Sequence, residues 1–433
     1  KQFNLFLWDN DEAKSFYLDN IKLIPLVAVK KSKINIFDAE FLPNPGEKVY
    51  ATQDYFSFDK SKWLKTDIKS NNDFVEVPLV INNYSSGNMP GVYFSGGIPF
   101  ARGELRSLNN IELVDKAGKP VKFQARVLSQ WPDKSIKWLL LDMDSDIVPE
   151  EKKYFLRYSP DIKGKKIDSS LIISEDKSVL SVVTGPLKFN LDKKGFRLFD
   201  KVWLDLNSDG NFSDSELVSQ AGDLVLLHNG EEYRSSLDRD YKLEIEERGP
   251  LKLGLKASGW FVSEKGNKFC QFIIRIYAFK GTSYLKVQHT FVYTGYPENK
   301  YHYLYKGKRL PKNETIDAIY IKIPLKLGNG SRFSFAADEK VIQGDLQGSL
   351  ELLQDNYNNY NLNQNGQRVN SGNKLDGWID LSNNEAGLAV GIKNFWQQFP
   401  KGFSLDRKNQ CIIAYLWPKQ AGELDFKTTQ AAL

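Results

Sequence analysis

Residues 123–144, FQARVLSQWPDKSIKWLLLDMD, decide the fold class of this chain. The segments 123–131 and 136–144 have the composition of β-strands, with apolar side chains recurring along each. Residues 132–135, PDKS, lie between them, and Pro followed by Asp is strong turn chemistry. The stretch therefore predicts a β-hairpin.

Strand patterns also dominate the rest of the chain. Residues 284–293, YLKVQHTFVY, alternate between apolar and polar, while 269–279 and 411–417 are typical of buried strands. Turn signals such as Asn229-Gly230 and Asn365-Gly366 separate such segments. Long stretches with helical periodicity are missing, so we predict an all-β protein built from several sheets.

A few segments depart from this pattern. Short helices are expected at 213–220 and near 350–355. Residues 355–374 are rich in Asn, Gln and Gly, which predicts a long surface loop.

Composition excludes several classes of function. The 433 residues include 59 Lys plus Arg and 54 Asp plus Glu, so a net charge of +5 does not indicate a nucleic-acid-binding protein. No apolar run approaches the roughly 18 residues of a membrane span.

Two Cys and three His leave little for a soft-metal centre or a thiol enzyme. Cys270 and Cys411 could pair or remain free thiols. The aromatic excess suits β-structure and polar ligands such as sugars.

Residues 205–216, DLNSDGNFSDSE, fit the twelve-residue calcium loop at every defined position. Calcium prefers six to eight oxygen ligands, and Gly at the sixth position permits the sharp turn. The preceding segment 197–204 reads as a strand, so the loop is not part of an EF-hand. We expect a structural calcium ion here, and the alternative is a polar hairpin without metal. The predicted ligands are Asp205, Asn207, Asp209, Asn211 and Glu216.

Residues 293–309, YTGYPENKYHYLYKGKR, concentrate groups suited to β-elimination on an acidic sugar. That chemistry needs a cation to neutralise the uronate carboxylate, a base to remove the C5 proton, and an acid to protonate the leaving oxygen. The candidate catalytic residues are His302, Tyr305 and Arg309, with Tyr301 and Tyr303 as candidate substrate contacts. The alternative is an exposed polar loop in which Tyr serves packing.

Aromatic residues elsewhere could stack on sugar rings. The segment 395–401, FWQQFPK, offers Trp396 beside Gln397 and Lys401 for substrate binding. Other candidates are Trp131, Trp138 and Trp378. For these three and for Trp396, a core position is the commoner role.

The two remaining His residues suggest no chemistry. His289 falls on the apolar face of its predicted strand, where a hydrogen-bonded core or inter-domain residue is expected. His228 precedes a turn, where exposure is expected.

Two stretches resemble the exo-rhamnogalacturonan lyase-like (PcRGLX/YetA-like) proteins. Residues 387–400, GLAVGIKNFWQQFP, and 416–418 look like the end of that family's central β-sandwich. The more specific likeness is to its N-terminal RIFT barrel, and it is carried by Gly97, Ile98, Pro99, Phe100, Gly103, Gln124, Trp131, Asp133, Ser135 and Trp138.

The resemblance covers about 87–433 and implies a RIFT-type β-barrel, a large antiparallel β-sandwich and then a C-terminal (α/α) toroid. It implies a bacterial secreted, periplasmic or cell-surface protein that degrades uronate-containing polysaccharides by β-elimination. We expect an N-terminal β segment at 1–60, which looks like the end of a carbohydrate-binding-type sandwich. A barrel at 61–165 and a sandwich at 166–420 should follow. Residues 421–433 would begin the toroid, so we expect a piece of a longer protein whose missing partner is that helical domain.

Two other functions remain open. A non-catalytic carbohydrate-binding or scaffold module would use the β-domains to position a partner. A glycoside hydrolase would need a carboxylate pair, which no spacing in the sequence marks.

Overall fold

The computed structural model describes residues 69–70, 74–81, 89–147, 152–164, 171–295, 314–327 and 330–424. All belong to one compact unit, Ile68–Leu433. The predicted segment 1–60 lies outside the described residues, as does 421–433 beyond Leu424. Within the described part, helical structure is limited to short 3-10 turns, and no helix is long and apolar enough to cross a membrane. The all-β prediction is confirmed.

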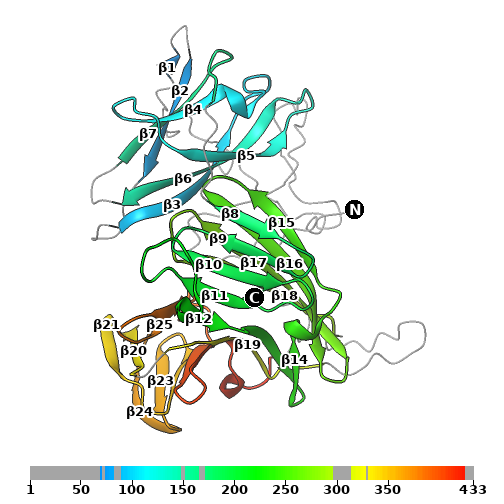
Figure 1. The fold of residues 1–433 in the computed structure, drawn as a ribbon, viewed down its shortest axis with the longest axis vertical. Helices are drawn as coiled ribbons and strands as arrows, with labels where there is room; N and C mark the ends of the chain where they lie inside the picture. The colour runs from blue at the N-terminus through cyan, green and yellow to red at the C-terminus, as the bar shows by residue number, and fades with distance from the viewer. Residues whose placement is uncertain are drawn as a thin grey trace, which may run out of the picture. The chain divides into compact units, whose positions relative to one another are not determined.

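The first domain, called the barrel domain here, is built from two antiparallel sheets around one core (Figure 1). The predicted hairpin is present, because β5 (Phe123–Gln130) pairs with β6 (Ile136–Ile147). Alternate residues such as Leu139 and Leu141 are buried in the core, as the period of two in a strand requires. The first sheet contains β3 (Met89–Pro99), β6 and β5, and the second contains β1 (Lys69–Ser70), β2 (Val75–Ile81), β7 (Lys152–Tyr158) and β4 (Ile111–Asp115).

The second part contains two β-sandwiches that share one twelve-stranded sheet. In the first sandwich, a five-stranded sheet packs on one half of the shared sheet around a core that includes Phe189 and Phe272. The five strands are β12 (Leu217–Gln220), β11 (Lys201–Leu204), β10 (Leu187–Asp192), β9 (Val179–Val183) and β8 (Ile172–Glu175). The facing strands are β18 (Leu285–Val292), β17 (Lys268–Phe279), β16 (Lys252–Ser263), β15 (Lys242–Arg248), β14 (Glu231–Arg234) and β13 (Asp223–His228).

The second sandwich uses the other half of the shared sheet. Its core includes Phe335 and Phe403. The shared strands continue as β19 (Ala318–Pro324), β28 (Cys411–Trp417), β27 (Lys401–Asp406), β22 (Ser349–Asn356), β23 (Asn359–Gln364) and β24 (Gln367–Gly372). The covering sheet contains β21 (Lys340–Asp345), β20 (Arg332–Ala337), β25 (Leu375–Ser382) and β26 (Gly387–Gly391).

The polar segment 355–374 corrects our prediction of a surface loop. It forms most of the hairpins β22–β23 and β23–β24, and the helix expected near 350–355 is part of β22. Asn365 and Gly366 adopt φ of 51° and 76°, which suits a tight hairpin turn between strands. Tyr360 and Leu362 are buried on one face of β23 and pack in the core of the second sandwich.

Two other predictions about local structure are also corrected. The helix expected at 213–220 is one 3-10 turn, Asp214–Glu216, followed by β12. His228 is buried, not exposed: its Nδ1 lies 2.6 Å from the Thr315 carbonyl oxygen, and its ring stacks on Phe269. Cys270 and Cys411 are both buried free thiols.

Candidate functional site at the barrel–sandwich junction

The candidate catalytic residues His302, Tyr305 and Arg309 lie outside the described residues, as do Tyr301 and Tyr303. The described flanks show where their segment leaves and rejoins the fold. It follows β18, and the Tyr293 hydroxyl donates a hydrogen bond of 2.8 Å to the carbonyl oxygen of Glu314. This is the opposite end of β18 from the β17–β18 hairpin, residues 280–284.

The predicted sugar contacts at 395–401 separate into surface and buried residues. Trp396 is half-buried, with the Lys374 ammonium 4.2 Å from its ring centroid, and Gln397 is exposed. Lys401 is buried and donates a hydrogen bond of 3.0 Å to the Leu416 carbonyl oxygen, and burial lowers its pKa. A surface role in sugar binding therefore stays a prediction for Trp396 and Gln397, and Lys401 would have to turn outward to join them.

The other aromatic candidates differ in availability. Trp138 is exposed, and Trp378 is half-buried. The indole nitrogen of Trp131 donates to the Phe100 carbonyl oxygen at 3.0 Å.

The predicted calcium loop is closed by its own hydrogen bonds. The Asp205 carboxylate accepts backbone N–H bonds from Asp209 and Gly210, each 3.0 Å long. Glu216 is buried and accepts from Leu206 and from Ser213, whose N–H and hydroxyl hold the pKa of that carboxyl below its usual range.

In this conformation the carboxylates of Asp205 and Glu216 are engaged in hydrogen bonds within the loop. Among the described residues, no group of three or more His, Cys, Asp or Glu side chains gathers around a possible metal position. Calcium binding by Asp205, Asn207, Asp209, Asn211 and Glu216 stays a prediction, and it requires Glu216 to exchange its hydrogen bonds for the ion.

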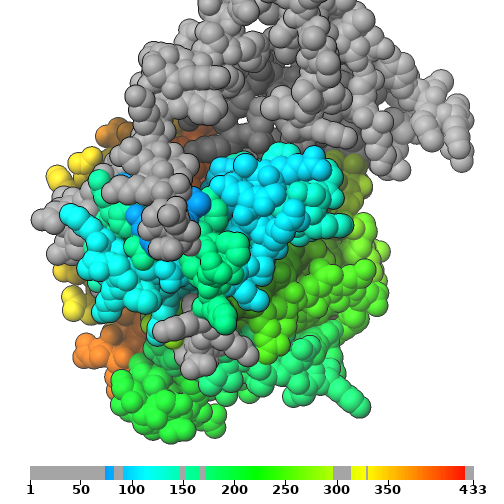
Figure 2. Space-filling view, turned by 90° about the horizontal axis from the view of Figure 1, so that it is seen from above, coloured from blue at the N-terminus to red at the C-terminus, as the bar shows by residue number. Residues whose placement is uncertain are grey.

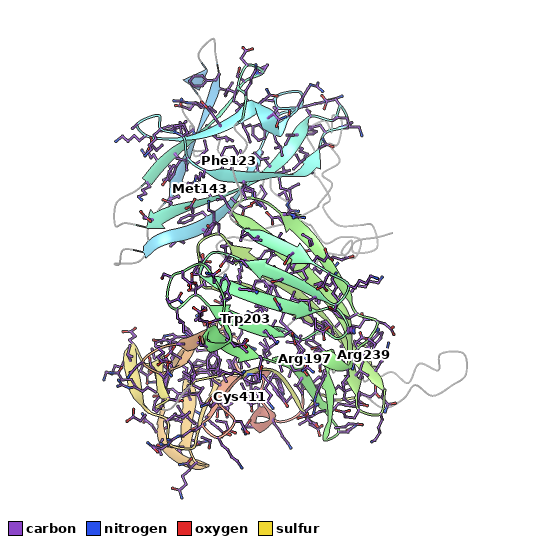
Figure 3. The ribbon with its side chains drawn as sticks, viewed as in Figure 1. Phe123, Met143, Arg197, Trp203, Arg239 and Cys411 are labelled. Atoms are coloured by element: carbon purple, nitrogen blue, oxygen red, sulfur yellow. The ribbon has the colours of Figure 1, made fainter. Side chains whose placement is uncertain are left out.

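Buried polar residues join the barrel domain to the first sandwich. Figure 3 labels Phe123 and Met143, which are register partners on the barrel sheet and pack at its core. Gln124 and Asp142, next along the same two strands, therefore point to the opposite face. Figure 2 shows that this domain, in cyan, lies next to the green strands of the first sandwich.

Lys252 is the centre of this junction. Its ammonium lies 2.9 Å from Asp142 Oδ1 and 3.2 Å from Glu247 Oε2. Burial alone would lower the pKa of Lys252, but the two carboxylates outweigh burial and raise it. We call Gln124, Asp142, Glu247 and Lys252 the junction cluster.

Gln124 completes the junction cluster with hydrogen bonds in both directions. Its amide nitrogen donates to Glu247 Oε1 at 2.7 Å, and its oxygen accepts the backbone N–H groups of Leu251 and Lys252. Ser95 donates to Asp142 Oδ1, while Asp142 Oδ2 is buried and has no partner among the described residues. The cluster thus holds two carboxylates and one ammonium in a site largely closed to water.

A pocket of about 580 Å³ lies beside the junction cluster, and we call it the junction pocket. Its barrel side includes Tyr93, Lys122 and Asp144. Tyr93 pairs with Asp144 across β3 and β6, as Ser95 pairs with Asp142, so pocket and cluster are neighbouring rows on one sheet face. The opposite side is the β17–β18 hairpin, including Lys280 and Tyr284, with Leu251 and Pro186.

The hairpin that forms this wall is held at three points. The Tyr93 hydroxyl donates to the Lys280 carbonyl oxygen at 2.5 Å. The Gly281 N–H donates to the Thr184 carbonyl oxygen at 2.7 Å, and the Thr184 hydroxyl donates to the Thr282 carbonyl oxygen at 2.6 Å. Gly281 has φ of 71° at this turn. The wall of the pocket is therefore fixed by the fold.

A second cavity, of about 730 Å³, lies between the two sandwiches and is lined mainly by aliphatic residues of β11, β19 and β26. His289 reaches it from β18, on the apolar strand face as predicted. Its Nε2 is buried and has no partner among the described residues, and burial lowers its pKa to about 4. The imidazole is therefore neutral at pH 7. The side chain is half-buried and lines the cavity, and its Nε2 does not make the expected hydrogen bond with any described residue.

Sequence reasoning missed the junction. Asp142 and Asp144 follow an apolar run and resemble ordinary outward-facing strand residues. Gln124 belongs to the family-like pattern, but nothing in the sequence shows that its partners are Glu247 and Lys252.

Comparison with known proteins matches both β-domains. Residues 82–152 match the PcRGLX-like N-terminal RIFT barrel domain, and residues 171–302 match the PcRGLX-like protein central beta sandwich domain. A relative from Bacillus subtilis (strain 168), named "Uncharacterized protein YetA", is 22% identical over 380 residues. That match covers 76% of this chain and 43% of the relative, so the chain spans less than half the length of the relative.

Proposed function

Because this chain carries the first two domains of a PcRGLX-like protein, we propose that it is the β-domain part of a polysaccharide lyase. The reaction would be β-elimination on uronate-containing glycans of the rhamnogalacturonan or pectin type. The observation that carries the proposal is the succession of a RIFT barrel and a central β-sandwich along one chain. We also propose that the protein is exported from the cell.

The chemistry is assigned to the segment after β18. Arg309 would neutralise the uronate carboxylate, His302 would remove the C5 proton, and Tyr305 would protonate the leaving oxygen. Elimination breaks the C4–O bond and forms a C4–C5 double bond, so the proton and the leaving group are both accounted for.

The test uses protein made from the complete coding sequence, incubated with a panel of uronate-containing glycans. Elimination leaves an unsaturated uronate, which absorbs in the ultraviolet, whereas hydrolysis releases reducing ends without that absorbance. Rising absorbance supports the lyase, and reducing ends alone would favour the glycoside hydrolase. No cleavage of any glycan in the panel would favour the binding module.

The residue assignment is tested separately on the best glycan. The variants His302→Ala and Tyr305→Phe should each reduce the elimination rate by about 100-fold or more, as expected for loss of a general base or acid. Tyr357→Ala is a suitable control, since Tyr357 is exposed on the β22–β23 turn. Wild-type rates in both variants would overturn the assignment.

A further inference from the structure

We propose that the junction pocket is a carbohydrate-binding site for a neutral sugar unit, formed by residues other than those assigned to catalysis. The proposal rests on the proposed function only in taking a glycan as the ligand. The volume of about 580 Å³ is within the range of small-ligand pockets, which are common at domain interfaces.

An aromatic row supplies a stacking surface. Tyr284 is 48% exposed and lines both the junction pocket and the second cavity. Its ring lies 5.4 Å from that of Phe279, which lies 4.8 Å from that of Tyr93. Burial raises the pKa of both Tyr93 and Tyr284, so the two phenols stay protonated at neutral pH. A half-exposed, uncharged Tyr ring held by aromatic neighbours can pack against the C–H face of a pyranose.

Two charged side chains supply the hydrogen bonds that sugar hydroxyls need. Asp144 and Lys122 are exposed at the pocket, and neither forms a side-chain hydrogen bond or ion pair with another described residue. Phe123 pairs with Met143 in the antiparallel hairpin. Lys122, one residue before β5, therefore lies beside Asp144, one residue further along β6. A carboxylate that accepts and an ammonium that donates, near one aromatic ring, can bind neighbouring hydroxyls of one sugar.

The balance of charge selects a neutral sugar over a uronate. The pocket lining carries one net positive charge, from Lys122 and Lys280 against Asp144, and the junction cluster beside it carries one net negative charge, from two carboxylates against one ammonium. Among the described residues, pocket and cluster together are therefore neutral, which favours a neutral sugar over a uronate.

The site is also fixed before a ligand arrives. The barrel wall is tied to the sandwich by the junction cluster, and the hairpin wall is held by Tyr93 and Thr184. Little ordering of protein groups is then needed on binding, which favours affinity from few contacts.

The experiment measures binding without turnover, by saturation-transfer NMR on the complete protein. The probes are galactose, rhamnose, glucose, arabinose, glucuronate and galacturonate. We expect at least one neutral sugar to bind, and the uronates to bind at least tenfold more weakly. Tyr284→Ala and Asp144→Asn should each weaken binding at least tenfold. Tyr284→Trp should retain binding, and Tyr357→Ala should match wild type, because Tyr357 is similarly exposed but lies on the β22–β23 turn.

The proposal is overturned if no neutral sugar binds, if only uronates bind, or if Tyr284→Ala and Asp144→Asn leave binding unchanged. Circular dichroism checks that each variant is folded. Ultraviolet assays on the same samples separate the two proposals. Neutral-sugar binding without elimination would refute the lyase alone, and elimination without such binding would refute the pocket alone.

Discussion

The molecule has two internal junctions, and they are built in different ways. The two sandwiches are joined by a continuous sheet, and β19 contributes Ile319 to the first core and Ile323 to the second. The barrel domain has no strand in that sheet, and its contact with the first sandwich includes the buried charges of the junction cluster.

The difference has an energetic consequence. Apolar burial is non-directional, whereas a buried ion cluster is favourable only when every charge keeps its partner. We therefore expect the two sandwiches to unfold together. We also expect single substitutions in the junction cluster to destabilise the barrel–sandwich contact strongly.

The largest effect is expected from Lys252→Met. This change leaves Asp142 and Glu247 as buried carboxylates without their cation, which should cost about 3–5 kcal/mol of unfolding free energy. Equilibrium urea denaturation measures the loss. Lys256→Met is the matched control on the same strand, because Lys256 pairs with the more exposed Glu244 and should cost about 1 kcal/mol or less. Equal costs for the two variants would show that the junction cluster has no special importance.

The shared sheet is tested next, by Ile319→Ala. Ile319 is 3% exposed, so the cavity left behind should cost about 2–4 kcal/mol. If the sandwiches are one cooperative unit, hydrogen exchange should show that amides of β10 and β27 lose protection to the same extent. Loss confined to the first sandwich would refute cooperativity across β19.

Elements with local sequence signals were predictable from the sequence. The β5–β6 hairpin and β28 were predictable because local alternation and turn residues encode them. The hairpins at 355–374 were missed because Asn is uncommon in strands, although Tyr360 and Leu362 already alternate.

The junction cluster was not predictable, for a different reason. Asp142 and Lys252 are 110 residues apart, and each alone reads as a surface charge. Only the docking of two domains makes them a buried pair. The candidate catalytic residues at 301–309 lie outside the described residues, so their roles stay predictions.

The unfolding free energy should depend on pH through His289, which lines the second cavity. The pKa of His289 is lowered to about 4 in the fold, against about 6.5 in an unfolded chain. The unfolded state therefore takes up a proton first, and stability is lost as the pH falls from about 6.5 to about 4. The loss should be about 1–3 kcal/mol. The stability difference between wild type and His289→Gln, measured by denaturation from pH 7 to pH 4, should shift by this amount. A constant difference would contradict a neutral buried imidazole.

The smallest effect is expected from calcium, and it should be confined to the stability of the two sandwiches. The loop 205–216 joins β11 to β12 in the first sandwich, so an ion held there should stabilise the sandwiches and not the junction cluster. Free calcium at about five times its dissociation constant would contribute about 1 kcal/mol. Melting temperatures in millimolar calcium and in excess EDTA measure this shift. Glu216→Gln should remove it, because the amide lacks the charge of the carboxylate. The amide has one acceptor oxygen and can keep only part of the hydrogen bonds that Glu216 accepts, so the quantity compared is the calcium-dependent shift and not the melting temperature itself. Glu385→Gln, at an exposed turn of the second sandwich, should leave it unchanged. If wild type melts at one temperature in both solutions, the loop is a hairpin closed by Asp205 and Glu216 without metal.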